Sequence, residues 1–309
     1  MSTLQHTLTD YLELRRELGY KLARAEKLLG QFLAFLEETG SAQLSTERAL
    51  AWACLPSRGN CGGWHTYRLS VVRGFARYLQ SRGIDAEVPP SDLLPWRAHR
   101  ASPYLYTEPQ IRALIEAARG LRSPLRVATY QVLIGLLAVT GLRVGEAIHL
   151  DRDDFDAASG VLLVRQAKFN KTREIPLHPS TVTALRRYLA RPDRRTLRVH
   201  VPALLVSPAG TRLLYCNVQW TFHRLVLAAG LRPRTRSCRP RIHDLRHSFA
   251  VRTLIEAYEQ GADVQQRLGV LSTYLGHVDP TKTYWYLSAS PELLGQAAKC
   301  LERHTGVPS

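Results

Sequence analysis

Apolar residues recur every three to four positions over most of the first ninety residues of the chain. This spacing places them along one side of an α-helix and predicts amphipathic helices. The helices are expected over residues 4–18, 23–38, a third segment capped by Ser45 or Thr46, and 64–82. Together they predict a small helical bundle over residues 1–88.

Helical spacing returns after residue 106 and continues almost to the end of the chain. Thr107 and Gln110 have the spacing of a capping box, with Pro109 in the first turn, so a helix should begin there. Residues 125–139 are apolar on all sides, which is typical of a helix buried in a core. Further helices are expected over residues 144–150, 179–189, 220–229, 242–258, 268–275 and 291–304.

The periodicity changes between residues 161 and 177. Residues 161–164 (VLLV) and 172–177 (TREIPL) predict two short β-strands, and the turn between them carries Lys168 and Lys171. The predicted fold is therefore mainly α with a small β-sheet, formed by a helical N-terminal domain and an α+β C-terminal domain.

Prolines are dense between residues 89 and 103, and the apolar periodicity is lost there. Such a composition is typical of a linker, and Arg97 and Arg100 make this one basic. We expect a helical domain at residues 1–88, a linker at 89–106 and a second domain at 107–309. A linker of this kind would let two domains close around a DNA duplex.

The charge of the chain predicts a polyanionic partner. Nucleic acid is the first candidate, and an anionic membrane is the second. The net charge is +16 and the isoelectric point is near 10. Residues 1–95 carry 11 Lys and Arg against 10 Asp and Glu, whereas residues 96–309 carry 31 against 16. A solvated helix face remains the alternative for the arginines of residues 64–82. The candidate DNA-binding residues are Arg68, Arg73, Arg77, Arg97, Arg100, Lys171, Arg173, Arg239 and Arg241.

Several classes of protein are disfavoured by the composition. No apolar run approaches the length of about 20 residues that a membrane span needs, and the N-terminus has the pattern of a helix and not of a signal peptide. The five cysteines are scattered, with no C-x-x-C pair, which disfavours a disulfide framework and a metal cluster. We expect a cytoplasmic protein.

The residues with the most chemistry lie between positions 243 and 286. His243 and Arg246 belong to the string HDLRH, His277 follows, and Tyr286 ends a segment with two tyrosines. A cation and imidazoles can hold a phosphate, and a phenol can attack it. The H-x-x-R-H string is weak on its own, so the rest of the chain must supply a second arginine, a lysine and a DNA-binding surface.

The rest of the chain does supply a second arginine and a lysine, in motifs that resemble those of the tyrosine recombinase (phage integrase) family. Residues 140–146 (TGLRVGE) are similar to the family's first arginine box, and residues 167–177 (AKFNKTREIPL) to its lysine-bearing hairpin. Residues 243–250 (HDLRHSFA) are similar to the second box, and LGH at 275–277 with the later Tyr286 to the third. The resemblance implies a simple two-domain recombinase of the Xer-like or transposon-encoded type.

The chemistry of phosphodiester cleavage agrees with this resemblance. In-line attack builds negative charge on the phosphate oxygens, and Arg143 and Arg246 can stabilise that charge without a metal. A tyrosine has a pKa near 10 and needs a proton acceptor at neutral pH, a role that His243 can take for Tyr286. By resemblance, Tyr286 forms a 3′-phosphotyrosine, which a 5′-hydroxyl of the partner strand then attacks.

The remaining candidates assist this reaction. Lys168 can protonate the departing 5′ oxygen, and His277 can donate a hydrogen bond to the phosphate. Glu146 is expected to orient His243 or Arg143, and His247 is a further supporting residue. The reaction needs no metal or other cofactor.

Several alternatives stay open. Tyr284 is the rival nucleophile, although its spacing from His277 is shorter than the family's. Lys171 is the rival acid, because Phe169 stands where the family commonly has glycine, which could change which lysine reaches the site. A helix at 291–304 can pack on its own domain or on a neighbouring protomer. The expected partner is double-stranded DNA at specific sites. The protein is expected to act as a homotetramer, with or without sister recombinases. This assembly would exchange strands through a Holliday junction during integration, excision or transposition. A type IB topoisomerase and a non-cutting DNA-binding accessory protein are the alternative functions.

Overall fold

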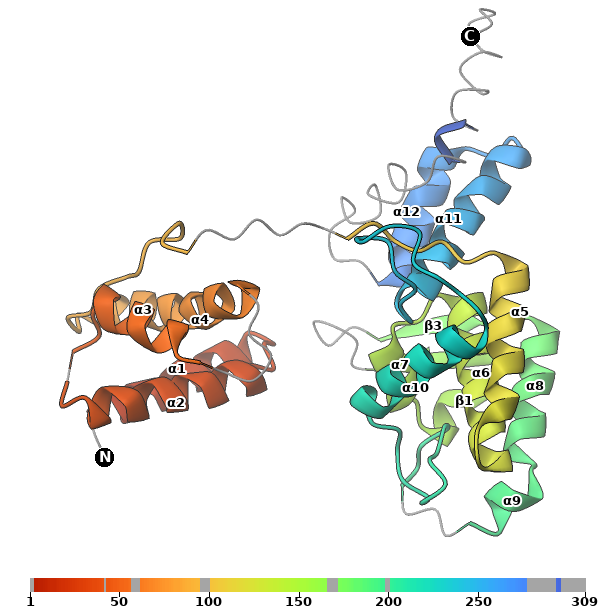
Figure 1. Ribbon diagram of the computed structural model, residues 1–309, viewed down its shortest axis with the longest axis horizontal. Helices are drawn as coiled ribbons and strands as arrows, with labels where there is room; N and C mark the ends of the chain where they lie inside the picture. The colour runs from red at the N-terminus through yellow and green to blue at the C-terminus, as the bar shows by residue number, and fades with distance from the viewer. Residues whose placement is uncertain are drawn as a thin grey trace, which may run out of the picture. The chain divides into compact units, whose positions relative to one another are not determined.

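The computed structural model describes residues 3–41, 43–56, 62–94, 101–165, 172–197, 201–276 and 293–295. The chain divides into two compact units, residues 1–100 and 101–309, each with its own hydrophobic core (Figure 1). Helices dominate both units, and a three-stranded sheet lies in the second. The predicted fold class, mainly α with a small β-sheet, is confirmed.

The N-terminal unit is built from amphipathic helices whose apolar sides face one another. Ser45 caps the third helix by accepting a hydrogen bond from the backbone N–H of Arg48. Phe32 and Trp52 lie in the core with ring centroids 5.2 Å apart, beside the fully buried Phe75. The helices are α1 (Thr3–Glu17), α2 (Ala23–Glu38), α3 (Thr46–Cys54) and α4 (Gly62–Ser81).

The proline-rich segment is shared between the two units. Val88, Leu93 and Leu94 pack against the core of the N-terminal unit. Tyr104 and Tyr106 belong to the core of the second unit. The apolar side chains that precede residue 95 thus pack on the first core, and those that follow residue 103 belong to the second. The loss of periodicity in the sequence did not indicate this packing.

The second unit carries the helices and strands that position the candidate site. In the part of the chain that the structure describes, no helix is long and apolar enough to cross a membrane. The elements are α5 (Glu108–Ala117), η1 (Ala118–Gly120), α6 (Pro124–Thr140), α7 (Val144–His149), η2 (Arg152–Asp154), β1 (Phe155–Asp156), β2 (Val161–Val164), β3 (Arg173–Pro176), α8 (Pro179–Leu189), α9 (Pro192–Arg195), α10 (Tyr215–Ala228), α11 (Asp244–Glu259) and α12 (Val264–Leu275).

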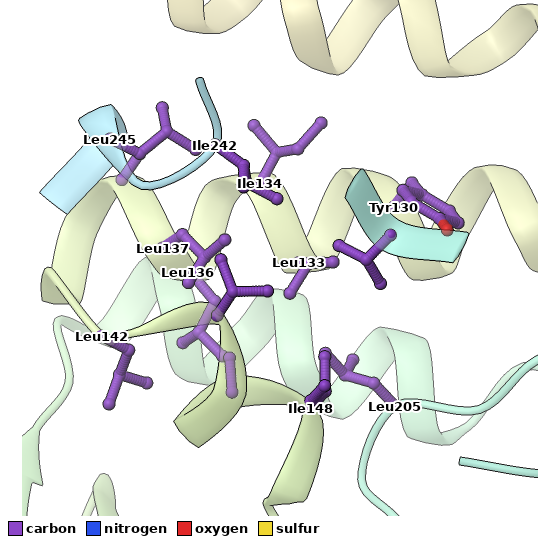
Figure 2. Packing of buried hydrophobic residues seen from close by; sticks show 14 of the residues in the cluster. Tyr130, Leu133, Ile134, Leu136, Leu137, Leu142, Ile148, Leu205, Ile242 and Leu245 are labelled. Carbon is purple, nitrogen blue, oxygen red and sulfur yellow. The ribbon is translucent and has the colours of Figure 1, made fainter. Parts of the chain in front are cut away.

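Helix α6 forms the centre of the second unit. Leu133 and Ile134 are fully buried and belong to the same hydrophobic cluster as Leu245, the first apolar residue of α11; Figure 2 shows part of this cluster. Helices α5, α8 and α11 all contact α6. The all-round apolar pattern of this helix thus reflects burial on all sides, as the sequence predicted.

The sheet is antiparallel with the strand order β1-β2-β3. Leu162 is paired with Phe155 on one side and with Ile175 on the other, and all three side chains are buried. The sequence predicted the β2–β3 pair but not β1. A strand of two residues is too short to show an alternating pattern.

Two helices begin earlier than their apolar pattern suggested. Helix α12 begins at Val264, where the side chain of Asp263 accepts hydrogen bonds from two backbone N–H groups. Its first turn contains Gln265 and Gln266, so it carries little apolar signal. Helix α10 begins at Tyr215, and its first turn is exposed.

Candidate active site

Two arginines that lie far apart in the sequence donate to the same backbone carbonyl at the end of α12. The carbonyl of Leu275 accepts from Nη2 of Arg246 at 2.7 Å and from Nη1 of Arg143 at 3.5 Å. Arg143 also donates to the carbonyl of Gly276 at 3.5 Å, and Arg246 to that of Gly141 at 2.8 Å. The two guanidiniums therefore converge on the Leu275 carbonyl, two residues before His277 in the sequence.

The close approach of these segments depends on glycine at position 141. Gly141 ends α6 with a φ of 61°, a left-handed conformation that favours glycine. A Cβ atom there would lie 2.5 Å from Cδ1 of Phe249 and 3.0 Å from Cδ2 of Leu275. Only a residue without a side chain lets α11 and α12 pack this closely against the start of the arginine box.

Arg143 stands at the N-cap of α7, and Glu146 fixes it from the first turn of that helix. One carboxylate oxygen of Glu146 accepts from the backbone N–H of Arg143 at 3.0 Å. The other accepts from the guanidinium of Arg143 at 2.8 Å. The Arg143 side chain keeps 29% of its surface exposed, against 8% for Glu146. The structure thus orients Arg143 through Glu146 while leaving the arginine accessible.

Arg246 lies in the first turn of α11 and is almost completely buried. Only 2% of its surface is exposed. A guanidinium has five N–H donors in a rigid plane, so one head can bridge the ends of two helices. Its bonds to Gly141 and Leu275 join the end of α6 to the end of α12.

A third arginine, which the sequence assigned to DNA binding, joins this cluster. Arg173 of β3 donates to both carboxylate oxygens of Glu146, at 3.3 and 2.8 Å. Burial alone would raise the pKa of the Glu146 carboxyl, but the hydrogen bonds and charges of Arg173 and Arg143 lower it to about 2. Glu146 therefore stays ionised across the physiological pH range.

His243 lies beside the arginine pair, directly before α11. Burial of the ring and nearby positive charges lower the pKa of its imidazole from 6.5 to about 4. The charges belong to Arg246, Arg143 and Arg241. Although His243 is exposed at the surface, the three guanidiniums stay close to its ring and disfavour the charged imidazolium. A neutral imidazole can accept a proton, as a general base must.

The lowered pKa of His243 predicts its titration in the DNA-free protein. The midpoint of its imidazole signals in an NMR titration should lie near 4, well below 6.5. Between these two pH values the unfolded chain binds a proton here that the folded chain does not. Stability from this group is therefore lost as the pH falls from about 6.5 to 4. The variant His243→Gln assigns the signal, and a midpoint at or above 6.5 would contradict the expectation.

Asp244 organises the residues that follow His243. Its carboxylate is fully buried and accepts hydrogen bonds from Arg241 at 3.0 and 3.1 Å. Nε2 of His247 lies 4.0 Å from the same carboxylate, and the His247 and His243 rings meet edge to face at 5.1 Å. The structure thus places His247 next to the candidate base, and it gives Arg241 an ion-pair partner.

The arginines of α4 divide into different environments. Arg68 is buried, donates to the carbonyls of Ala53 and Leu55 at the end of α3, and lies over the Trp52 ring. This placement differs from the DNA-facing position expected, because a helix end with unpaired carbonyls accepts the guanidinium. Arg73 donates to the carbonyls of Pro89 and Pro90.

The other candidates for DNA contact are exposed or lie outside the described residues. Arg77 of α4 is exposed, and so is Arg239, which lies in the loop before α11. Arg97, Arg100 and Lys171 fall outside the part of the chain that the structure describes, as do the catalytic candidates Lys168, His277 and Tyr286.

The structure brings together Arg143, Glu146, His243 and Arg246, as the motifs predicted, and adds Arg173. Sequence spacing did not indicate that Arg173 shares the carboxylate of Glu146, because the two residues lie on different elements. Guanidiniums around a neutral imidazole are suited to a phosphate that gains negative charge during cleavage. The class of protein that this geometry fits is an enzyme of phosphoryl transfer on nucleic acid.

Comparisons with known proteins agree with that class. A model of the phage integrase family matches residues 105–292. The integrase/recombinase y4rB of Sinorhizobium fredii is 45% identical, with 98% of each chain covered. Tyrosine recombinase XerC of Alcanivorax borkumensis is 31% identical over 81% of this chain and 76% of its own. The solved structure of the Tn1549 transposon integrase in complex with transposon right end DNA matches with a TM-score of 0.65 at 18% identity, covering 98% of this chain and 99% of that one.

The chain belongs to the phage integrase family of tyrosine recombinases, which are DNA strand-exchange enzymes. The family match covers residues 105–292, which include both arginine boxes, the hairpin strands and the cluster around Glu146.

Proposed function

We propose that the protein is a site-specific recombinase that cleaves and rejoins DNA through a 3′-phosphotyrosine and a Holliday junction. The observation that carries this proposal is the convergence of Arg143 and Arg246 on the Leu275 carbonyl, two residues before His277 in the sequence. A phosphate bound at this point would meet two guanidiniums, which can stabilise the charge that develops during in-line attack.

Each proposed role follows from the position or chemistry of its residue. His243, neutral above a pKa of about 4, is the proposed acceptor of the Tyr286 proton. Lys168 would protonate the leaving 5′ oxygen, and His277 would hydrogen-bond the phosphate. Conservation of the broken bond's energy in the phosphotyrosine lets the strands rejoin without an external energy source.

The proposed partners are double-stranded DNA and further copies of the chain. Strand exchange between two sites needs four active sites, so we propose a homotetramer in the synapse, with or without sister recombinases. The resemblance to a transposon integrase bound to transposon end DNA favours the integration, excision or transposition of a mobile element. Because the proposed substrate is chromosomal or element DNA, we propose that the protein acts in the cytoplasm.

The test begins with selection of a DNA site. Random duplexes are incubated with the protein, and the DNA that stays attached after denaturation is recovered and sequenced. A duplex of that sequence, nicked near the cleavage position, should then trap a covalent adduct, because the short fragment diffuses away and religation cannot occur. The adduct should form equally with a chelator present. The absence of any denaturation-resistant adduct would overturn the proposed function.

Two further measurements separate the alternative functions. A type IB topoisomerase would relax supercoils in DNA that lacks the selected site, whereas a recombinase should produce recombinant strands only from two DNA molecules that both carry it. A non-cutting accessory protein would bind the site without forming the adduct. Binding should weaken steeply as salt is raised, since arginine contacts with phosphates release counterions.

A further inference from the structure

The position of Arg173 differs from that of an ordinary DNA contact. Its guanidinium faces Glu146 and meets both carboxylate oxygens, at 3.3 Å and 2.8 Å. The same two oxygens hold the backbone N–H and the guanidinium of Arg143. One carboxylate therefore joins β3 to the first turn of α7, and its orientation decides where Arg143 points.

A second contact places Arg173 against the end of α12. Gly276 has a φ of 66°, and a Cβ atom on it would lie 3.1 Å from Nη1 of Arg173 and 3.4 Å from its Cζ atom. The guanidinium thus lies close to the turn whose carbonyl accepts a hydrogen bond from Arg143. Arg173 supports Arg143 from two sides, through Glu146 and through the backbone at Gly276.

The burial of the pair favours a positioning role over a role in DNA affinity. Only 13% of the Arg173 side chain is exposed, and only 8% of the Glu146 side chain. Removing one partner of a buried ion pair usually leaves the other charge buried and unpaired, which is destabilising. In this site Glu146 would still have Arg143 if Arg173 were removed. The expected loss is therefore of orientation and not of charge balance.

We propose that Arg173 is a positioning residue for DNA cleavage, which holds the Glu146 carboxylate and the turn at Gly276 so that Arg143 is presented to the scissile phosphate. The inference rests on the proposed function, since it concerns the cleavage step. It replaces the assignment of Arg173 to DNA binding. A displaced Arg143 would lose contact with the developing charge, and misplacement by about 1 Å can cost on the order of a hundredfold in rate.

The test measures single-turnover cleavage of the nicked duplex at several DNA concentrations. Arg173→Met, which keeps much of the side-chain volume and removes the guanidinium, should lower the maximal rate by roughly tenfold to a hundredfold. The DNA concentration that gives half of the maximal rate should stay the same. Arg173→Lys keeps the charge but cannot bridge two oxygens, and it should recover only part of the rate.

A double variant and a matched control make the outcome specific. Glu146→Gln should lower the rate, and adding Arg173→Met to it should lower the rate little further, because both changes act through one carboxylate. Arg212 is the control: it donates to the carbonyls of Ile148 and Leu150 and pairs with Asp151 at the opposite end of α7. Arg212→Met should affect thermal stability without the same loss of cleavage rate.

Each result decides for or against the inference. A rise in the half-saturating DNA concentration with an unchanged maximal rate would make Arg173 a DNA contact and overturn it. An unchanged cleavage curve in Arg173→Met would also overturn it, while wild-type cleavage leaves the proposed function standing. If Arg173→Met does not fold, a wild-type rate in folded Arg173→Lys would count against the bidentate contact. A wild type that forms no adduct is a failure of the proposed function and not of this inference alone.

Discussion

The variant Tyr286→Phe should form no covalent adduct with the nicked duplex, whereas the wild type accumulates it. Phenylalanine keeps the ring and removes only the hydroxyl that would attack phosphorus. No other change should follow, so DNA binding should remain near that of the wild type. The adduct is measured by denaturing electrophoresis, and binding by a gel-shift titration. The expected loss is complete within the background of the assay, because the covalent bond forms through the hydroxyl that this substitution removes.

Two other tyrosines provide the controls for this prediction. Tyr284→Phe should still form the adduct, since its distance from His277 in the sequence is shorter than the family pattern. Tyr274 stacks on Phe249 with ring centroids 5.7 Å apart, and burial raises the pKa of its phenol to about 12. Tyr274→Phe should therefore also form the adduct. An adduct that persists in Tyr286→Phe and is lost in Tyr284→Phe would reassign the nucleophile.

The sequence predicted those parts of the fold that depend on local signals. Helix α2 has its predicted bounds, and α5 begins at the capping box of Thr107 and Gln110. Both signals act within one or two turns, so neighbouring residues suffice to show them. The apolar pattern of α6 also predicted burial on all sides, because a helix with no polar face has no side to present to water.

The sequence could not predict contacts that depend on how the elements pack. Arg68 and Arg77 lie on the same helix, yet one is buried against the end of α3 and the other is exposed. Helical spacing alone gave both the same interpretation. Arg173 was likewise grouped with surface cations, although its ion pair with Glu146 joins residues 27 positions apart. Such pairs become visible only when the strand and the helix are placed in space.

The candidate site shows both outcomes. Arg143 and Arg246 were found from their short motifs, and the structure confirms that they converge. The point at which they meet is the backbone carbonyl of Leu275, and backbone atoms carry no signal in the residue type. The glycine at 276 was recognised as part of a motif, and the structure shows that its φ of 66° lies in the left-handed region, where a side chain is disfavoured.

Arg246→Lys should lower the maximal cleavage rate by about a hundredfold to a thousandfold, the range seen when one preorganised donor to a developing charge is removed. Lysine keeps the positive charge, but its ammonium is a compact group that cannot reach the carbonyls of Gly141 and Leu275 as a planar guanidinium does. The buried position also makes the substitution destabilising, because an ammonium with too few partners is costly there. Thermal denaturation measures that second effect separately from single-turnover cleavage.

Arg252 is the matched control for Arg246. It lies on the same helix and donates to the carbonyl of Ala138 in α6 at 3.2 Å, but 37% of its side chain is exposed. Arg252→Lys should therefore change stability slightly and leave the cleavage rate close to that of the wild type. If Arg246→Lys and Arg252→Lys cleave equally well, the contact of Arg246 with the end of α12 serves only the fold. A large loss confined to Arg246→Lys, measured on folded protein, shows instead that the same guanidinium both joins two helices and acts in cleavage.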